Sequence, residues 1–172
     1  MGRHSPRTRH APSDDPSETA DGREEPTPEP GVHRDYVLDV RIVETDPAEA
    51  TVGGDATDRG RYRFEAPNHD GRTFDDPETA EVYAAVYFDA NGFVEAGTGD
   101  RGVPPEVVQA GRDTLAAYLL TQPYADRHWV ASFYGKAPEY VERYVESVRH
   151  RAREVRRGVR ERDDEAIRDA EP

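Results

Sequence analysis

A group of cationic and aromatic side chains follows a single glycine in the C-terminal third of the chain. Its members are Lys136, Tyr140, Arg143, Arg149, Arg151 and Arg153, and the glycine is Gly135. Arginine and lysine can donate hydrogen bonds to phosphates and to base edges, which is the chemistry of nucleic-acid contacts. These residues are therefore the candidate DNA-binding residues, and the elements around Gly135 must position them.

The spacing around Gly135 predicts two helices joined by a tight turn. Ala131, Gly135 and Val141 stand four and six residues apart. A helix-turn-helix needs a small residue, a positive-φ residue and a branched apolar residue at these positions. Pro138 suits the first turn of the second helix, where its missing N–H is not needed. Residues 127–148 thus resemble the helix-turn-helix of small transcription regulators, which implies a DNA-binding regulator or accessory factor.

The same stretch departs from that pattern in two respects. Lys136 follows the glycine, where the motif usually has an apolar residue. The second helix also presents Glu139, Glu142 and Glu146, and carboxylates repel phosphates, although one can accept from cytosine N4. A helical hairpin that is closed by a glycine turn and packed on a core is the alternative interpretation.

The last helix suggests a second function, that of a protein-interaction or assembly module. We expect this helix to run from Pro138 well past His150, with an apolar face formed by Tyr140, Val141, Tyr144, Val145, Val148 and Val155. Such a face could pair with another protein or with a second copy. Residues 149–162 contain seven arginines against two glutamates, and these arginines would meet acidic partner surfaces. An exposed apolar stripe on this helix would favour this function over DNA binding.

Composition restricts the other classes of function. The 172 residues include no cysteine, which excludes disulfides, zinc–thiolate sites and cysteine nucleophiles. No apolar run is long enough to span a membrane and none follows Met1 as a secretory signal, so we expect a cytoplasmic protein. Familiar catalytic motifs are missing, so we expect no enzyme and no cofactor. The run Gly97–Gly102 matches the dinucleotide-binding pattern G-x-G-x-x-G, which requires a helix directly after it. Here Val103-Pro104-Pro105 separates the run from the following helix, so we interpret it as a loop that leads into that helix.

The charge composition is that of a protein adapted to salt. Acids number 36 and bases 23, for a net charge of -13, and Lys136 is the only lysine. This resembles the proteins of extremely halophilic archaea. In about 1 M salt the Debye length is only about 3 Å, so the repulsion within such a surface is screened. The acidic surface therefore indicates a solvent adaptation rather than a binding site.

Along the chain, the pattern predicts an α+β fold with three parts. Residues 1–34 form a proline-rich, disordered tail, 35–160 a single domain, and 161–172 an acidic C-terminal tail. A small antiparallel sheet is expected from strands at 36–43, 61–65 and 72–74, with a loop at 46–60. A helical C-terminal half follows, with the helix-turn-helix-like hairpin and the long last helix.

Helix starts can be placed from capping residues. Asp76 caps a helix that we extend to about Ala90, although residues 82–96 also fit a hairpin turning at Asn91-Gly92. Residues 105–122 predict one continuous apolar helix that forms the centre of the core. Asp126 caps the first helix of the hairpin, and we expect its Trp129 and Phe133 to face the core.

Overall fold

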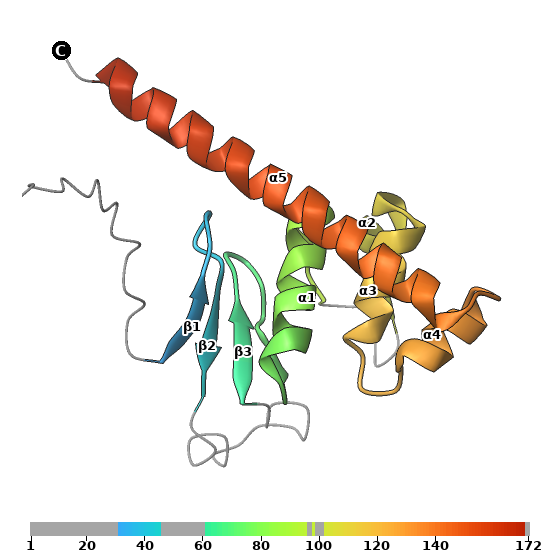
Figure 1. The fold of residues 1–172 in the computed structure, drawn as a ribbon. Helices are drawn as coiled ribbons and strands as arrows, with labels where there is room; N and C mark the ends of the chain where they lie inside the picture. Colours follow the sequence, from blue (N-terminus) through green and yellow to red (C-terminus); the bar gives the residue numbers. More distant parts are fainter. Residues whose placement is uncertain (1–30, 46–60, 96–97, 99–101, 171–172) are drawn as a thin grey trace, which may run out of the picture.

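The computed structural model describes residues 31–45, 61–95, 98 and 102–170. Within these ranges an antiparallel sheet is followed by five helices. The last of these helices is long and crosses the others (Figure 1). The predicted α+β class, with the sheet in the N-terminal half and helices in the C-terminal half, is confirmed. The predicted loop at 46–60 and most of the glycine run at 97–102 lie outside the described residues.

The sheet is a meander of four short strands. Its order is β1-β2-β3-β4, and each neighbouring pair is antiparallel. The strands are β1 (Val32–Asp35), β2 (Arg41–Glu44), β3 (Tyr62–Glu65) and β4 (Arg72–Phe74). The predictions for β3 and β4 are confirmed. Ile42 pairs with Phe64 across the centre of the sheet, and both side chains are fully buried.

The strand predicted at 36–43 is wrong in its first half. Residues between β1 and β2 form a turn that the N–H of Tyr36 closes by donating to the carbonyl of Val40, at 2.8 Å. Leu38 and Asp39 have φ values of 61° and 55°, and Leu38 is exposed. The alternation of apolar residues that predicted this strand therefore extends across a turn, so it did not indicate where the strand begins. Residues 32–34 of β1 lie in the predicted N-terminal tail, so the tail prediction is wrong for these residues.

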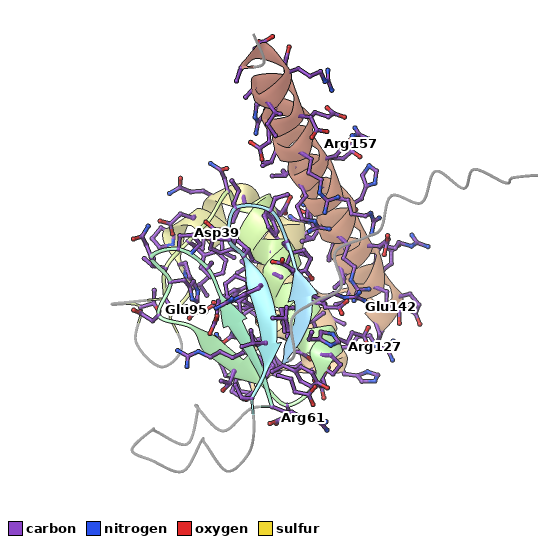
Figure 2. All side chains as sticks on the ribbon, turned by 90° about the vertical axis from the view of Figure 1, so that its left-hand side faces the viewer. Asp39, Arg61, Glu95, Arg127, Glu142 and Arg157 are labelled. Carbon is purple, nitrogen blue, oxygen red and sulfur yellow. The ribbon has the colours of Figure 1, made fainter. Side chains whose placement is uncertain are left out.

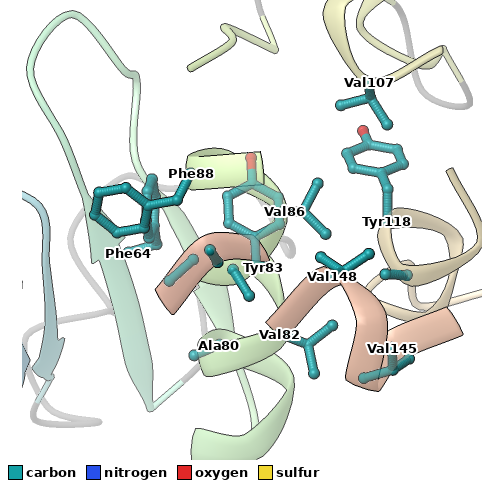
Figure 3. Close-up of a cluster of buried hydrophobic side chains, with 14 of the residues drawn as sticks. Phe64, Ala80, Val82, Tyr83, Val86, Phe88, Val107, Tyr118, Val145 and Val148 are labelled. Carbon is teal, nitrogen blue, oxygen red and sulfur yellow. The ribbon is translucent and has the colours of Figure 1, made fainter. Parts of the chain in front are cut away.

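Helix α1 (Pro77–Asp89) forms the centre of the core. Asp76 caps it, because its carboxylate accepts from the Thr79 N–H at 2.9 Å. Residues 77–89 are helical, so the helix interpretation of this region is confirmed over the hairpin. Asn91 and Gly92 take left-handed φ values of 60° and 86° just beyond the end of the helix. Its buried side chains pack against the sheet on one side and against the long last helix on the other (Figure 3).

The single helix predicted over 105–122 is two helices, α2 (Pro105–Ala110) and α3 (Arg112–Leu120). Gly111 separates them with φ 123° and ψ 178°, a conformation that only glycine adopts without strain. The break allows each short helix to bury its own face. This pair is also not the centre of the core, since α1 buries more side chains than α2 and α3.

Helices α4 (Arg127–Phe133) and α5 (Pro138–Ala170) complete the fold. Asp126 caps α4 by accepting from the Trp129 N–H at 2.7 Å, as predicted. Helix α5 crosses α1 and α3, and its C-terminal part projects beyond the sheet (Figure 1). The helix continues to Ala170, so the segment assigned to an acidic tail from 161 is helical as far as that residue. In the described part of the chain, no helix has the length and apolar character to cross a membrane.

Candidate nucleic-acid interface

Helices α3, α4 and the start of α5 enclose a small core of their own. Its buried side chains are Ala116, Leu119, Val130, Ala131 and Val141. Tyr134 and Tyr144 cover its edge with their rings 6.1 Å apart in an edge-to-face contact. These three helices therefore form a compact unit within the domain, and α5 links that unit to the main core.

The turn between α4 and α5 has the geometry that its glycine requires. Gly135 has φ 61°, and its N–H donates to the carbonyl of Ser132 at 3.0 Å. The next N–H, that of Lys136, donates to the carbonyl of Ala131 at 2.9 Å. Ala131 and Val141 are buried on either side of the turn. A small residue at 131 thus lies where α4 and α5 pack together, and the exposed face of α5 begins immediately after the turn.

Three of the candidate DNA-binding residues form one exposed group, which we call the tip cluster. The ammonium of Lys136 lies 5.6 Å from the ring centroid of Tyr140, and the Arg143 guanidinium lies 5.2 Å from it. Tyr140 is 44 % exposed. Two cations are thus held over one aromatic ring at the N-terminal end of α5, by contacts worth roughly 0.5–1 kcal/mol each at exposed sites.

The other three candidates are not part of that group. Arg149 is roughly 180° around the helix from Tyr140. It lies in a groove of about 510 Å³ between α1 and α5, where it is 3.4 Å from the Glu78 carboxylate. Arg153 lies about one helical turn beyond Arg149, toward the projecting end of α5, and it pairs with Glu146 at 3.0 Å. The six residues that we selected from the sequence therefore divide between different faces of α5.

Arg151 has a structural role. Its guanidinium donates to Asp89 of α1 and to Asp113 of α3, at 2.7 Å each. Thr114 donates to the same Asp89 carboxylate at 2.7 Å. The hydrogen bond to Asp89 raises the pKa of Arg151 above its ordinary value. Arg151 thus links α5 to α1 and α3. This geometry favours a structural role over the predicted contact with DNA.

Two of the three glutamates on the exposed face of α5 have a cationic neighbour. Glu142 pairs with Arg127 at the start of α4, and Glu146 pairs with Arg153. Figure 2 shows Arg127 and Glu142 together on one side of the molecule. Glu139 is the third of these glutamates and is next to Tyr140 in the sequence. Its single negative charge compares with the two positive charges of the tip cluster. The start of α5 is therefore less acidic in the structure than the count of its glutamates suggests.

Trp129 and Phe133 do not face the core as predicted. They are 41 % and 59 % exposed, and their rings stack at 5.6 Å with an angle of 11° between planes. The inward positions of α4 are taken by Val130 and Ala131 instead. A seven-residue helix buries one narrow stripe, and both 129/133 and 130/134 have the spacing of such a stripe. The large size of Trp129 and Phe133 therefore did not indicate which side chains of α4 are buried.

The exposed rings line a hollow that we call the aromatic groove, with a volume of about 540 Å³. Its walls come from α2, α3, α4 and the segment before α4. They include Val108, Leu115, Leu119, Tyr124, Trp129 and Phe133, and the lining side chains that the structure describes are all apolar or aromatic. The groove could not be predicted from one continuous helix over 105–122, because its walls include residues of α2 and of α3, on either side of the break at Gly111.

A half-buried polar network centred on Glu95 was also missed. One Glu95 oxygen accepts from Arg72 at 2.8 Å and from the Tyr83 hydroxyl at 2.7 Å, and the other accepts from Tyr118 at 3.0 Å. Arg72 also donates to the Gln122 side chain at 2.8 Å. Both hydroxyls and the carboxylate are thereby satisfied, which is the arrangement of a structural network rather than of a free nucleophile or base.

His69 extends this network. Its Nδ1 accepts from the Gly71 N–H at 3.0 Å, so its Nε2 donates to the Tyr83 oxygen at 3.0 Å when the ring is neutral. Burial lowers the pKa of His69, so the neutral form is favoured in the folded protein. Among the described residues, no group of three acidic or histidine side chains is arranged to hold a metal ion.

Comparison with known proteins identified no relatives. No family model matches the chain, and neither the curated proteins nor the solved structures include a match.

Proposed function

We propose that the protein binds DNA through the unit formed by α3, α4 and the start of α5. The observation that carries this proposal is the turn at Gly135, with its left-handed backbone between the buried residues Ala131 and Val141. That arrangement packs α4 closely against α5 while it leaves the first turns of α5 exposed. An exposed helix that begins at such a turn is the element that helix-turn-helix proteins place in the major groove.

The tip cluster supplies the contacts in this proposal. Lys136 and Arg143 are both exposed and are held by the Tyr140 ring at the N-terminal end of α5. The unpaired N–H groups at a helix N-terminus add a partial positive charge there, which favours phosphate. Glu139 can accept from cytosine N4 instead of facing a phosphate. The proposed surface is thus small, and its readout depends on hydrogen bonds more than on net charge.

The alternative function, assembly through the last helix, has less support. The apolar stripe of α5 is formed by Val141, Val145, Val148, Ala152 and Val159, and all five are buried against the protein itself. An exposed stripe was the feature that would have favoured pairing with a partner. The buried stripe leaves α5 with Tyr140, Val155 and Ile167 as exposed large apolar residues, and these do not form a continuous line.

The salt adaptation expected from the composition fits a cytoplasmic DNA-binding protein in a saline cell and determines the assay. High KCl suppresses nonspecific phosphate attraction, because counterion release then contributes little free energy. Binding of the full chain to random-sequence duplex DNA should therefore be measured by fluorescence anisotropy from low to molar KCl. Retained binding in molar KCl, with enrichment of particular sequences on selection, supports the proposal.

Charge-matched double variants test which surface binds. Lys136→Gln with Arg143→Gln removes two cations from the tip cluster, and Arg157→Gln with Arg160→Gln removes two exposed cations from the projecting part of α5. Figure 2 labels Arg157 on that part of the helix. We expect the first pair to weaken binding by roughly tenfold or more in high KCl and the second to have little effect. Equal losses would assign the binding to general charge, and no binding by the unaltered chain would overturn the proposal.

A further inference from the structure

The aromatic groove is an unusual surface on this molecule. The chain is 34 % charged, yet none of the described side chains that line the groove is charged. Val108, Tyr124, Trp129 and Phe133 are all large apolar or aromatic residues that the described structure leaves exposed along it. Exposed apolar patches that gather in one place usually mark contact surfaces, whereas single exposed residues do not.

We infer that the aromatic groove is the surface through which two copies of the protein form a two-fold symmetric dimer. In a two-fold interface the same patch is used by both partners, so it must provide both the projecting group and the hollow that receives it. This patch provides both. Phe133 is the most exposed of the lining residues, at 59 %, and it stands beside a hollow of about 540 Å³.

The projecting rings are also arranged for such a contact before association. Trp129 stacks on Phe133 at 5.6 Å, and Tyr124 contacts Trp129 edge-to-face at 5.8 Å. Rings that already hold one another lose little conformational freedom on binding. Aromatic residues in place of charged ones are the composition that distinguishes the buried centre of protein interfaces.

The described lining of the groove fits an uncharged counterpart, which the same patch on a second copy provides. Each copy has a net charge of -13, so two copies repel over most of their surfaces and least where an uncharged patch meets its counterpart. Duplex DNA does not fit the groove, because the described lining has no cation to meet a phosphate. A basic partner would find no carboxylate among the same described residues. Dimer formation is separate from DNA binding, since the tip cluster is not part of the groove.

The experiment uses the full chain and two readouts. Sedimentation velocity over a concentration series gives the dimer dissociation constant. Trp129 is the only tryptophan in the sequence, so its emission reports on the groove directly. We expect a dimer at high concentration and a shift of the Trp129 emission to shorter wavelength that follows the dimer fraction. Raising KCl should tighten the dimer, because salt screens the repulsion between two acidic copies.

Matched variants locate the interface. Phe133→Asp and Val108→Asp place a charge in the groove at two exposed positions on different helices, and Ile167→Asp places one at an exposed position on the projecting end of α5. The groove variants should raise the dissociation constant by at least about tenfold and Ile167→Asp by less than about twofold. Circular dichroism checks that each variant is folded.

Three results would overturn the inference. The first is a monomer at all concentrations and KCl levels, whether its Trp129 is exposed or is shielded by another part of its own chain. The second is a dimer that the groove variants leave intact. The third is an equal loss from Ile167→Asp, which would assign the effect to added charge.

Discussion

Replacing Gly135 with alanine tests the turn on which the proposed function depends. At φ 61° an alanine places its Cβ close to the following carbonyl, which costs roughly 1–2 kcal/mol. No other atom lies within 4 Å of the Cβ position at Gly135. The whole effect is therefore a backbone effect, and we expect Gly135→Ala to lower the free energy of unfolding by about 1–2 kcal/mol. Gly135→Asn should cost less, since asparagine tolerates this conformation.

Gly158 provides the matched control. It lies within α5, has no positive φ, and the nearest atom to its Cβ position is the end of the Arg162 side chain at 3.9 Å. Alanine is favoured over glycine inside a helix by roughly 0.5–1 kcal/mol. Gly158→Ala should therefore raise the free energy of unfolding where Gly135→Ala lowers it.

Both variants are compared by chemical denaturation at one fixed KCl concentration. The midpoint should move in opposite directions, with an unchanged dependence on denaturant. A Gly135→Ala variant that is as stable as the unaltered protein would refute the reasoning, because the turn would then not be left-handed in solution. A loss well above about 3 kcal/mol would also contradict it, since backbone strain alone does not reach that value.

Further predictions concern the ion pairs and the polar network. Arg151→Gln should lower the free energy of unfolding by about 2 kcal/mol, because it leaves the almost fully buried Asp89 carboxylate without its cation. The expected loss is smaller than for a fully buried ion pair, since the Arg151 side chain is 42 % exposed. Arg149→Gln, which loses only a long contact with Glu78, should change it by less than about 1 kcal/mol in the same denaturation assay. Because the pKa of His69 is lowered in the folded protein, the unfolded chain binds more protons as pH falls below about 6.5, so stability should decrease there. His69→Gln should reduce that pH dependence, which thermal unfolding across pH 5–7 would measure. Arg143→Gln should reduce the slope of log affinity against log KCl by about one without changing stability, if it contacts a phosphate.

Features that depend on a few neighbouring residues could be predicted from the sequence. The caps at Asp76 and Asp126 require only a carboxylate before a helix, and both are present. The sheet followed by helices was also predictable from residue periodicity. In contrast, the turn at Leu38-Asp39 places a leucine in a left-handed conformation that its side chain disfavours, although aspartate adopts this conformation more readily. Gly111 lies inside the stretch 105–122 that predicts a single helix, although its backbone conformation ends one helix and begins another.

The candidate site was less predictable than the fold, since it depends on distant contacts. Arg151 is one of many arginines in α5, and only the folded structure places it against Asp89 and Asp113. The same limit applies to Glu95, whose partners come from other elements of the fold. A chain this rich in carboxylates and arginines offers many possible pairings, and sequence spacing does not select among them.

Contact between the tip cluster and DNA is the most direct test of the central claim. A photoreactive amino acid would replace Tyr140 in one variant and Ile167, an exposed position on the same helix, in another. Each variant would be irradiated with duplex DNA in molar KCl, where nonspecific binding is weak. The proposal predicts crosslinks from position 140 and none above background from position 167. Crosslinks from 167 alone, or equally from both positions, would contradict it.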